Sequence, residues 1–325
     1  MKVGILGSGG VGSLFGGFLA GAGHEVWFVD TRPEHVEAIN HGGLLIKSQG
    51  ESRRVAGFGT TDPGAVGAVE LLMLWCKSQS SAAAIEAGQP MFGAETIAFT
   101  AQNGLGNPER LEAVVGPDRL VYGTTEIGGT VRAPGVIEVT EGAWTGTGKT
   151  YLGSRDSKPA RERLETVAGA LRGAKLTIEV TDQIDSMLWN KVSAASLSPV
   201  AASLRLRLTD LIKYEEAREI IEDATREVAA VANAKGIQLD ADAAVEKNFH
   251  MYSVAVSPNH LPSMVVDVLR QQPTEIGSTC EMVARLGAEV GVDAPVNRTL
   301  GRLMRTVEQH YGDQLLGTLE EAVAE

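Results

Sequence analysis

The most constraining feature of this 325-residue chain is a glycine-rich segment near its N-terminus, Gly7-Ser8-Gly9-Gly10-Val11-Gly12. A buried strand pattern at residues 2–6 leads into this segment, and a small-residue helical pattern through Ala22 follows it. A second apolar strand at residues 26–29 ends in Asp30, which lies 18 positions after Gly12. This order of strand, glycine turn, helix and acidic strand end favours a dinucleotide-binding turn over a glycine turn that binds nothing.

The three glycines of the pattern have separate expected roles. Gly7 allows a tight turn, Gly9 lets a pyrophosphate approach the backbone, and Gly12 lets the helix lie close to the strand. Free N–H groups and the positive end of the helix then face the phosphates. We therefore predict that the whole turn binds a cofactor, through Gly7, Ser8, Gly9, Gly10, Val11 and Gly12.

Composition limits the class of protein. The length allows two domains, each with its own core. A hydrophobic content of 43% and a charged content of 22% are typical of a soluble globular chain. The net charge of −12 disfavours nucleic acid and anionic membranes as partners, but a small anionic substrate needs only a local positive site.

Targeting segments and metal motifs are not evident in the sequence. A core strand begins at residue 2, so we expect no signal peptide, and no apolar run reaches the ~18 residues of a membrane span. We therefore predict a cytoplasmic protein whose two distant cysteines, Cys76 and Cys280, are reduced thiols. The six histidines lack ligand spacing, so we expect no metal site.

The order of patterns predicts an α/β protein with a Rossmann-type N-terminal domain. A helix begins at Pro33, and extended stretches at 44–47 and 52–58 look like a hairpin that extends the sheet. The residues from 123 to 152 look like antiparallel strands that close the domain. The other predicted elements are strands at 71–75, 97–100, 120–122 and 176–180, and helices at 80–87, 108–115 and 160–172.

The rest of the chain predicts an all-helical C-terminal domain. Helical spacing is clearest at 215–235, 281–290 and 297–307. We place the boundary between residues 181 and 182, which gives a dinucleotide-binding domain, 1–181, and a helical substrate and catalytic domain, 182–325. We expect a small substrate to bind in the cleft between them.

Several motifs occur together in the order and spacing of one enzyme family. They are the glycine turn, Lys77 at a strand end, Gln102-Asn103-Gly104, Leu188-Trp189-Asn190-Lys191, Ser263-Met264 with Asp267, Thr274-Glu275-Ile276 and Gly291-Val292-Asp293-Ala294-Pro295-Val296-Asn297. In these motifs nearly the whole chain resembles the ketopantoate reductase (2-dehydropantoate 2-reductase) family. The resemblance implies NADPH-dependent reduction of a branched 2-oxo acid to the 2-hydroxy acid, in pantothenate biosynthesis.

The resemblance also implies roles for three catalytic residues. Lys191 would be the general acid that protonates the carbonyl oxygen, and Glu275 would hold the substrate hydroxyl. Asn103 would lie at the junction of nicotinamide and substrate. Taken singly, Lys191 also fits an exposed helix lysine, Glu275 a first-turn glutamate after Pro273, and Asn103 a turn residue before glycine.

Three further residues are binding candidates. By the resemblance, Ser263 would bind the substrate carboxylate and Lys77 would lie near the cofactor phosphates. Ser198, in the segment after Lys191, is a second substrate-binding candidate. Ser263 follows a proline and also fits a helix cap. Lys77 and Asn103 both follow strands, where ligands of open α/β sheets bind.

The chain departs from the family beyond the catalytic lysine. Members usually carry asparagines one and two turns after it, where this chain has Ser193-Ala194-Ala195-Ser196-Leu197-Ser198-Pro199, and the segment Leu204–Arg207 lacks another expected asparagine. Fewer amides mean fewer polar contacts to the far end of the substrate. The expected substrate is therefore 2-dehydropantoate or a related branched 2-oxo acid.

The choice of cofactor depends on two residues. Asp30 is placed to accept hydrogen bonds from the ribose hydroxyls of NAD and to repel a 2′-phosphate. Family members that prefer NADPH carry an arginine near this point, and Arg32 lies two residues further on. Residue chemistry favours NADH, whereas the family habit favours NADPH.

Two other functions fit the same fold. One is a non-catalytic nucleotide-binding or redox-sensing protein, which the missing asparagines favour. The other is a reductase of a different carbonyl or imine substrate, which would need another group at the carbonyl. A homodimer is expected because helical domains often bury an apolar face against a second copy.

Overall fold

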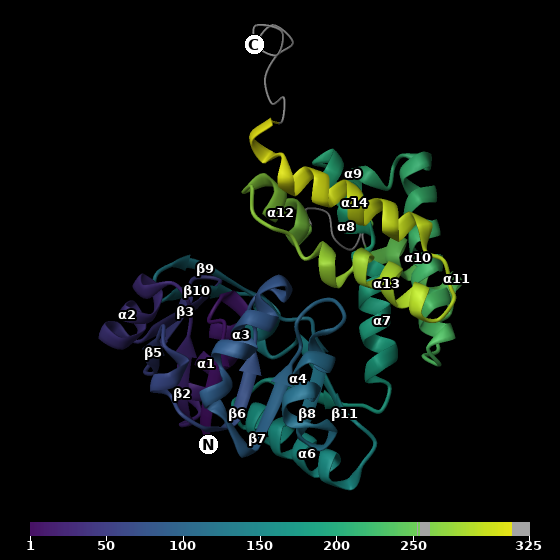
Figure 1. Cartoon of the computed structure of the whole chain (residues 1–325). Helices are drawn as coiled ribbons and strands as arrows, with labels where there is room; N and C mark the ends of the chain where they lie inside the picture. The colour runs from purple at the N-terminus through teal and green to yellow at the C-terminus, as the bar shows by residue number, and fades with distance from the viewer. Residues whose placement is uncertain (252, 254–260, 314–325) are drawn as a thin grey trace, which may run out of the picture. The chain divides into compact units, whose positions relative to one another are not determined.

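The computed structural model describes residues 1–251, 253 and 261–313 (Figure 1). The chain divides into two compact units, Met1–Leu188 and a second unit that begins at Trp189. The division falls inside helix α7 (Ile184–Ala195), whereas the sequence places the boundary just before that helix begins.

Unit 1 is built on an eight-stranded sheet in the order β12-β11-β8-β7-β6-β1-β2-β5. Strand β1 lies between β2 and β6 and pairs in parallel with both. The order therefore reverses beside β1, which is where doubly wound sheets bind their ligands. The bounds are β1 Lys2–Leu6, β2 Glu25–Val29, β5 Phe58–Thr60, β6 Val69–Leu74, β7 Phe92–Thr100, β8 Leu120–Thr125, β11 Lys149–Ser154 and β12 Thr177–Val180.

Both faces of this sheet are buried, because alternate residues of a strand point to opposite sides. Val3 and Ile5 of β1 pack in a core with helices α1 (Gly10–Gly21) and α6 (Lys158–Gly173). Leu6 packs in another core with α3 (Ser81–Ala87) and α4 (Asn107–Val115), which cover β6, β7 and β8 in Figure 1. Near-continuous apolar strands such as β6 are the result.

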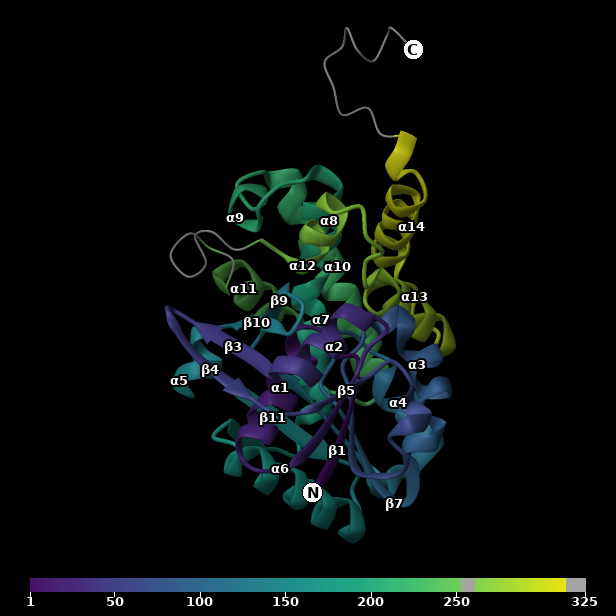
Figure 2. The same cartoon turned by 90° about the vertical axis from the view of Figure 1, so that its left-hand side faces the viewer.

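A second sheet in unit 1 corrects the predicted hairpin. The hairpin forms as β3 (Leu44–Ser48) and β4 (Glu51–Val55), but it does not extend the main sheet. It belongs to a four-stranded sheet, β4-β3-β10-β9, with β9 Gly129–Ala133 and β10 Val136–Val139 (Figure 2). Leu44 and Ile46 pack with α1 in the same core, so α1 lies between the two sheets.

The remaining predictions for unit 1 are largely confirmed. Helix α2 (Pro33–Gly42) begins at the expected proline. Between residues 123 and 152, β9 pairs antiparallel with β10, and β11 pairs antiparallel with β8. The same stretch also contains a short helix, α5 (Glu141–Thr145), that the sequence pattern did not predict.

Unit 2 is helical in the part that the structure describes. Its predicted helices are confirmed as α10, α13 and α14. One core joins them to their neighbours through residues such as Leu211, Val265, Ile276 and Met304. The bounds are α8 Leu197–Leu204, α9 Leu208–Leu211, α10 Glu215–Ala234, α11 Ala241–Met251, α12 Ser263–Leu269, α13 Cys280–Glu289 and α14 Pro295–Gln309.

No helix among the described residues combines the length and the apolar character needed to cross a membrane.

Candidate nucleotide and substrate site

The glycine turn begins where β1 ends. Gly7 has φ +94°, a left-handed conformation that glycine adopts without strain. The N–H groups of Gly7 and Ser8 donate to the carbonyl oxygen of Val29 at 2.9 and 3.2 Å, which ties the turn to the end of β2. A Cβ at Gly7 would lie 2.3 Å from the backbone nitrogen of Cys76, so the turn also lies against the loop after β6.

The space around the glycines separates their roles. A Cβ at Gly12 would lie 2.1 Å from the carbonyl oxygen of Gly7, and a Cβ at Gly10 would lie 1.9 Å from that of Gly129. By contrast, a Cβ at Gly9 meets no described atom within 4 Å. Gly10 and Gly12 therefore serve the packing of the protein. Gly9 faces open space that a ligand could fill.

The start of α1 suits a phosphate group. Gly9 is its N-cap, and the first turn, Gly10 to Ser13, carries no charged side chain. The first N–H groups of a helix lack partners within the helix, and they carry its positive partial charge. An anion in the space beside Gly9 would face both, so these residues fit a pyrophosphate.

Asp30 and Arg32 form a bidentate ion pair beside this turn. Arg32 Nε lies 2.8 Å from Asp30 Oδ1, and Arg32 Nη2 lies 3.0 Å from Asp30 Oδ2. Burial raises the pKa of Asp30, but the hydrogen bonds and charge of Arg32 outweigh burial and hold the pKa below its ordinary value. Arg32 Nη2 also donates to the carbonyl oxygen of Ser8 at 3.2 Å. The structure thus brings Asp30, Arg32 and Ser8 together.

Lys77 and Asn103 follow β6 and β7, and both are exposed. Ser78, next to Lys77, donates its hydroxyl to the carbonyl oxygen of Asn103 at 3.2 Å. Asn107 at the start of α4 donates to the same Ser78 hydroxyl at 3.1 Å. The two loops are therefore held together at the carboxyl edge of the sheet, beside the turn that contains Gly7.

Gln102 organises these two loops, a role that no sequence pattern indicated. Its Oε1 accepts from the Thr100 hydroxyl at 2.9 Å, and its Nε2 donates to the Ser81 hydroxyl at 3.2 Å and to the carbonyl oxygen of Cys76. The side chain is buried, and these bonds link the end of β7 with the start of α3. Its position beside Asn103 was visible in the sequence, but its burial was not.

In unit 2, Lys191 and Glu275 are both half-buried. Lys191 lies on α7, whereas Glu275 precedes a short 3-10 helix, Ile276–Ser278. The alternative of a glutamate in the first turn of an α-helix is therefore wrong, because α13 begins only at Cys280. The carbonyl oxygen of Glu275 accepts from the Ser278 N–H at 3.0 Å, which holds the backbone turn.

The serine candidates differ in environment. Ser263 is exposed and is the first residue of α12, whose N-cap is Pro262, so the alternative of a helix cap is wrong. Ser198 is half-buried on α8. Ser193 and Ser196, in the segment where asparagines were expected, donate their hydroxyls to the backbone oxygens of Asn190 and Ser193 at 2.7 and 2.6 Å.

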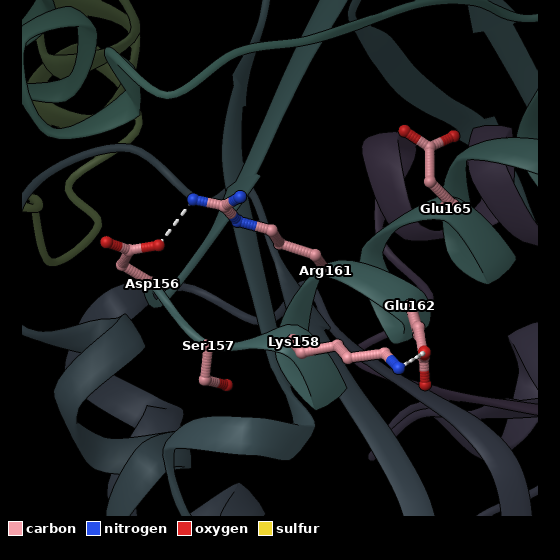
Figure 3. Close-up of a pocket in the computed structure, with 6 residues that line it drawn as sticks. All are labelled: Asp156, Ser157, Lys158, Arg161, Glu162 and Glu165. Atoms are coloured by element: carbon pink, nitrogen blue, oxygen red, sulfur yellow. Dashed lines mark hydrogen bonds and ion pairs between the residues drawn. The ribbon is translucent and has the colours of Figure 1, made fainter.

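A surface pocket of about 670 Å³ lies at the start of α6, as Figure 3 shows. Its lining side chains pair with one another, Arg161 with Asp156 and Lys158 with Glu162. Strand β11 runs antiparallel to β8 and ends opposite Val121 near the start of β8. The pocket therefore lies toward the amino ends of the parallel strands, away from the glycine turn.

A smaller pocket of about 140 Å³ lies next to the glycine turn. It is lined by residues at the start of α2 and of the β9–β10 hairpin. Its charged lining residues are Arg32, Glu34 and Arg132. Among the residues that the structure describes, no three His, Cys, Asp or Glu side chains are arranged to hold a metal ion.

Comparison with known proteins agrees with this architecture. The chain is 29% identical to the 2-dehydropantoate 2-reductase of Pyrococcus horikoshii, over 96% of this chain and 99% of that protein. It resembles a solved PanE/ApbA family ketopantoate reductase from Ralstonia eutropha, with a TM-score of 0.83 and 26% identity over 95% of this chain and 99% of that one. A D-mandelate dehydrogenase solved with NADH and anilino(oxo)acetate shares the fold. Its TM-score is 0.86, and it is 24% identical over 95% of this chain and 99% of that one.

The family patterns cover both units of the chain. Residues 3–157 match the family described as Ketopantoate reductase PanE/ApbA, and residues 183–308 match the C-terminal region of the same family. Since the two matches together span most of the sequence, this chain belongs to the ketopantoate reductase family.

Proposed function

We propose that this chain reduces a 2-oxo acid to the corresponding 2-hydroxy acid with a reduced nicotinamide dinucleotide. Membership of the family makes it an oxidoreductase. The observation that carries the proposal is the open space at Gly9 beside an uncharged helix start, which fits a pyrophosphate. When bound, the nicotinamide supplies the hydride. The protein must then supply a proton and hold the acid.

Lys191 is the proposed proton donor. Hydride addition leaves negative charge on the carbonyl oxygen, so a cation that can release a proton is needed there. Lysine suits this role because its ammonium group is a positive point charge that can release a proton, which a guanidinium does not do. Its half-buried position on α7 and the half-buried Glu275 in the same unit are compatible with these roles. Glu275 and Asn103 would orient the reacting groups.

The proposed substrate is 2-dehydropantoate or a related branched 2-oxo acid. The hydroxyls of Ser193 and Ser196 are directed to the helix backbone, so they do not replace the missing amides. Ser198 and Ser263 are the proposed contacts to the substrate. A wall of small apolar residues does not select a distal hydroxyl. Branched 2-oxo acids with or without that hydroxyl are therefore the proposed class, and 2-dehydropantoate is the reference compound.

NADH is the proposed cofactor. Asp30 is ionised and largely buried, with a side chain that is 9% exposed, which suits two ribose hydroxyls. A 2′-phosphate at the same place would meet this carboxylate. The guanidinium of Arg32 is already engaged by Asp30, which leaves less of its charge for a phosphate.

The decisive experiment is a screen of branched, linear and aromatic 2-oxo acids, including 2-dehydropantoate, with NADH and with NADPH. We expect oxidation of the reduced cofactor with at least one acid. Binding of the cofactor without turnover for any acid would contradict the reductase assignment and favour the non-catalytic alternative.

A Lys191→Ala variant tests the proton donor. We expect kcat to fall by roughly 10²–10⁴-fold, the range of general acid catalysis, while the Kd of the cofactor stays within about twofold. Lys191→Arg should be equally inactive because a guanidinium does not release its proton. The matched control is Lys235→Ala at an exposed helix end. Unchanged turnover in Lys191→Ala would refute the assignment.

The expectations of a cytoplasmic location and a homodimer remain part of this proposal. Light scattering of the purified chain at catalytic concentration measures the oligomeric state directly.

A further inference from the structure

A buried histidine beside the glycine turn has no part in the function proposed so far. His35 lies in the first turn of α2 and is 1% exposed. Its Nδ1 lies 3.3 Å from the backbone nitrogen of Gly135, and its Nε2 lies 3.4 Å from the hydroxyl of Ser13. Each ring nitrogen thus faces a polar group from a different element.

The partners determine the tautomer of the ring. The backbone N–H of Gly135 can only donate, so Nδ1 must be the acceptor and, in the neutral ring, Nε2 carries the hydrogen. Nε2 then donates to Ser13, and the Ser13 hydroxyl donates to the carbonyl oxygen of Ser8 at 2.9 Å. A series of hydrogen bonds therefore connects the β9–β10 hairpin to the glycine turn through His35 and Ser13.

The same hairpin touches the turn at a second point. A Cβ at Gly10 would lie 1.9 Å from the carbonyl oxygen of Gly129, where β9 begins. The Ser8 carbonyl oxygen, which accepts from Ser13, also accepts from Arg32 at 3.2 Å. The conformation of the turn is thus held by hydrogen bonds from α1, α2 and, through His35, the small sheet.

We propose that His35 is a positioning residue for the dinucleotide, and that it holds the glycine turn in its binding conformation through Ser13 and Ser8. The proposal rests on cofactor binding by this turn, as proposed above. His35 would not touch the cofactor. Its effect is on cofactor affinity, because the backbone of Ser8 and Gly9 must be held before the phosphates arrive.

The protonation state of His35 supplies an independent readout. Burial, and after it the charge of Arg32, lowers the pKa of His35 below its ordinary value of 6.5, so the ring is neutral at pH 7. The charged groups that act on it are Arg32 and Glu34 of its own segment and Asp30 after β2, and Arg132 from β9 lines the same small pocket. A protonated Nδ1 would be a donor facing the donor N–H of Gly135, so the hydrogen bond between His35 and Gly135 would break.

The test replaces one ring nitrogen at a time. His35→Asn places an acceptor near the position of Nδ1 but loses the bond to Ser13, and His35→Gln places a donor near the position of Nε2 but loses the bond to Gly135. His35→Leu loses both. We expect His35→Leu to raise the KM and Kd of NADH by about tenfold, as for the loss of buried hydrogen bonds, with kcat at saturating NADH within about twofold. The Asn and Gln variants should lie between wild type and Leu.

Two controls separate positioning from general damage. His41 is an exposed histidine near the end of the same helix, and its Nδ1 bonds the backbone oxygen of Glu37. His41→Asn and His41→Gln should leave the affinity for NADH unchanged. Ser13→Ala should raise the Kd of NADH like His35→Asn, and the double variant of these two should be less than additive because both break the bond between His35 and Ser13. In wild type the Kd should rise as pH falls below 6.5, and this dependence should vanish in His35→Gln.

The outcomes are distinguishable. Unchanged cofactor affinity in His35→Leu, or a pH dependence that persists in His35→Gln, overturns the positioning role and leaves the proposed function intact. A lower kcat with an unchanged KM for NADH would also overturn it, since that pattern indicates a smaller folded fraction. A wild-type chain that binds neither NADH nor NADPH overturns the proposed function and this inference together.

Discussion

At the scale of single residues, the choice between NADH and NADPH depends on the pair of Asp30 and Arg32. An ionised carboxylate at the end of β2 accepts hydrogen bonds from ribose hydroxyls. The bidentate contact with Arg32 keeps Asp30 charged, because it lowers the pKa of the carboxyl despite burial. The two residues therefore act as a unit, and replacing either changes the charge that a 2′-phosphate would meet.

Replacement of Asp30 should move the cofactor preference toward NADPH. In Asp30→Ala the carboxylate is absent and Arg32 is released to meet a phosphate. Two charges about 4 Å apart interact by roughly 1–4 kcal/mol between bulk water and the protein surface, so the ratio of kcat/KM for NADPH to that for NADH should rise at least about fivefold. Arg32→Ala should lower the same ratio. A shift in the same direction in both variants would contradict the opposite roles of the carboxylate and the guanidinium.

The residues of the site were predictable to different degrees. The glycines and Asp30 were found because a dinucleotide turn requires a fixed order of strand, glycines, helix and acid. Gln102 and His35 carried no such signal. His35 is bonded to Gly135, 100 positions away, and only the folded sheet brings them together. A buried polar residue that acts through the backbone leaves no spacing pattern in a single sequence.

At the scale of elements, helix α1 has three kinds of neighbour at its start. Its first turn packs against β1 at Gly12 and against β9 at Gly10, and it leaves open space at Gly9. The glycines look alike in the sequence, but a side chain would have a different consequence at each position. This difference allows folding and binding to be separated by substitution.

Gly9→Ala should bind cofactor poorly while it folds normally. Its backbone, with φ −67° and ψ −163°, suits alanine, and its Cβ would meet no described atom within 4 Å. The methyl group would occupy the space of the pyrophosphate, so we expect the Kd of NADH to rise at least about tenfold with Tm within about 2 °C of wild type. Titration calorimetry and thermal melts measure the two quantities.

Gly12→Ala is the matched comparison. Its Cβ would lie 2.1 Å from the backbone oxygen of Gly7, so helix and strand must separate. Overpacking of this kind costs about 1–3 kcal/mol, and we expect a lower Tm. Equal melting temperatures for Gly9→Ala and Gly12→Ala would contradict the separation of roles.

The pairing of the small sheet shows the limit of strand patterns. The extended stretches at 44–47 and 52–58 predicted a hairpin correctly, because a hairpin depends on local sequence. Its partner was not predictable, since β3 pairs with β10, a strand about ninety positions later. The apolar side chains of Leu44 and Ile46 are buried in the core that contains α1.

At the scale of the whole molecule, the order of strand and helix patterns in the sequence predicts two units of different secondary structure. Apolar strands alternating with helices predict a parallel sheet, and a long helical remainder predicts a separate core, so the fold class was readable from the sequence. The boundary was harder to place because the division falls within α7, where no loop composition marks it. Unit 1 carries the proposed nucleotide site, and unit 2 carries the proposed proton donor.

If the nucleotide binds only the folded chain, it must stabilise unit 1 by mass action. At a nucleotide concentration of 100 times Kd, the free energy of unfolding rises by about 2.7 kcal/mol. Hydrogen exchange should then slow in the glycine turn and the first turn of α1, and the thermal transition of unit 1 should move up by several degrees, as expected for a domain of this size. Gly9→Ala at the same NADH concentration should show clearly smaller effects, because a tenfold higher Kd reduces the gain to about 1.4 kcal/mol while the fold is kept. Equal protection in wild type and Gly9→Ala would place the nucleotide elsewhere on the chain.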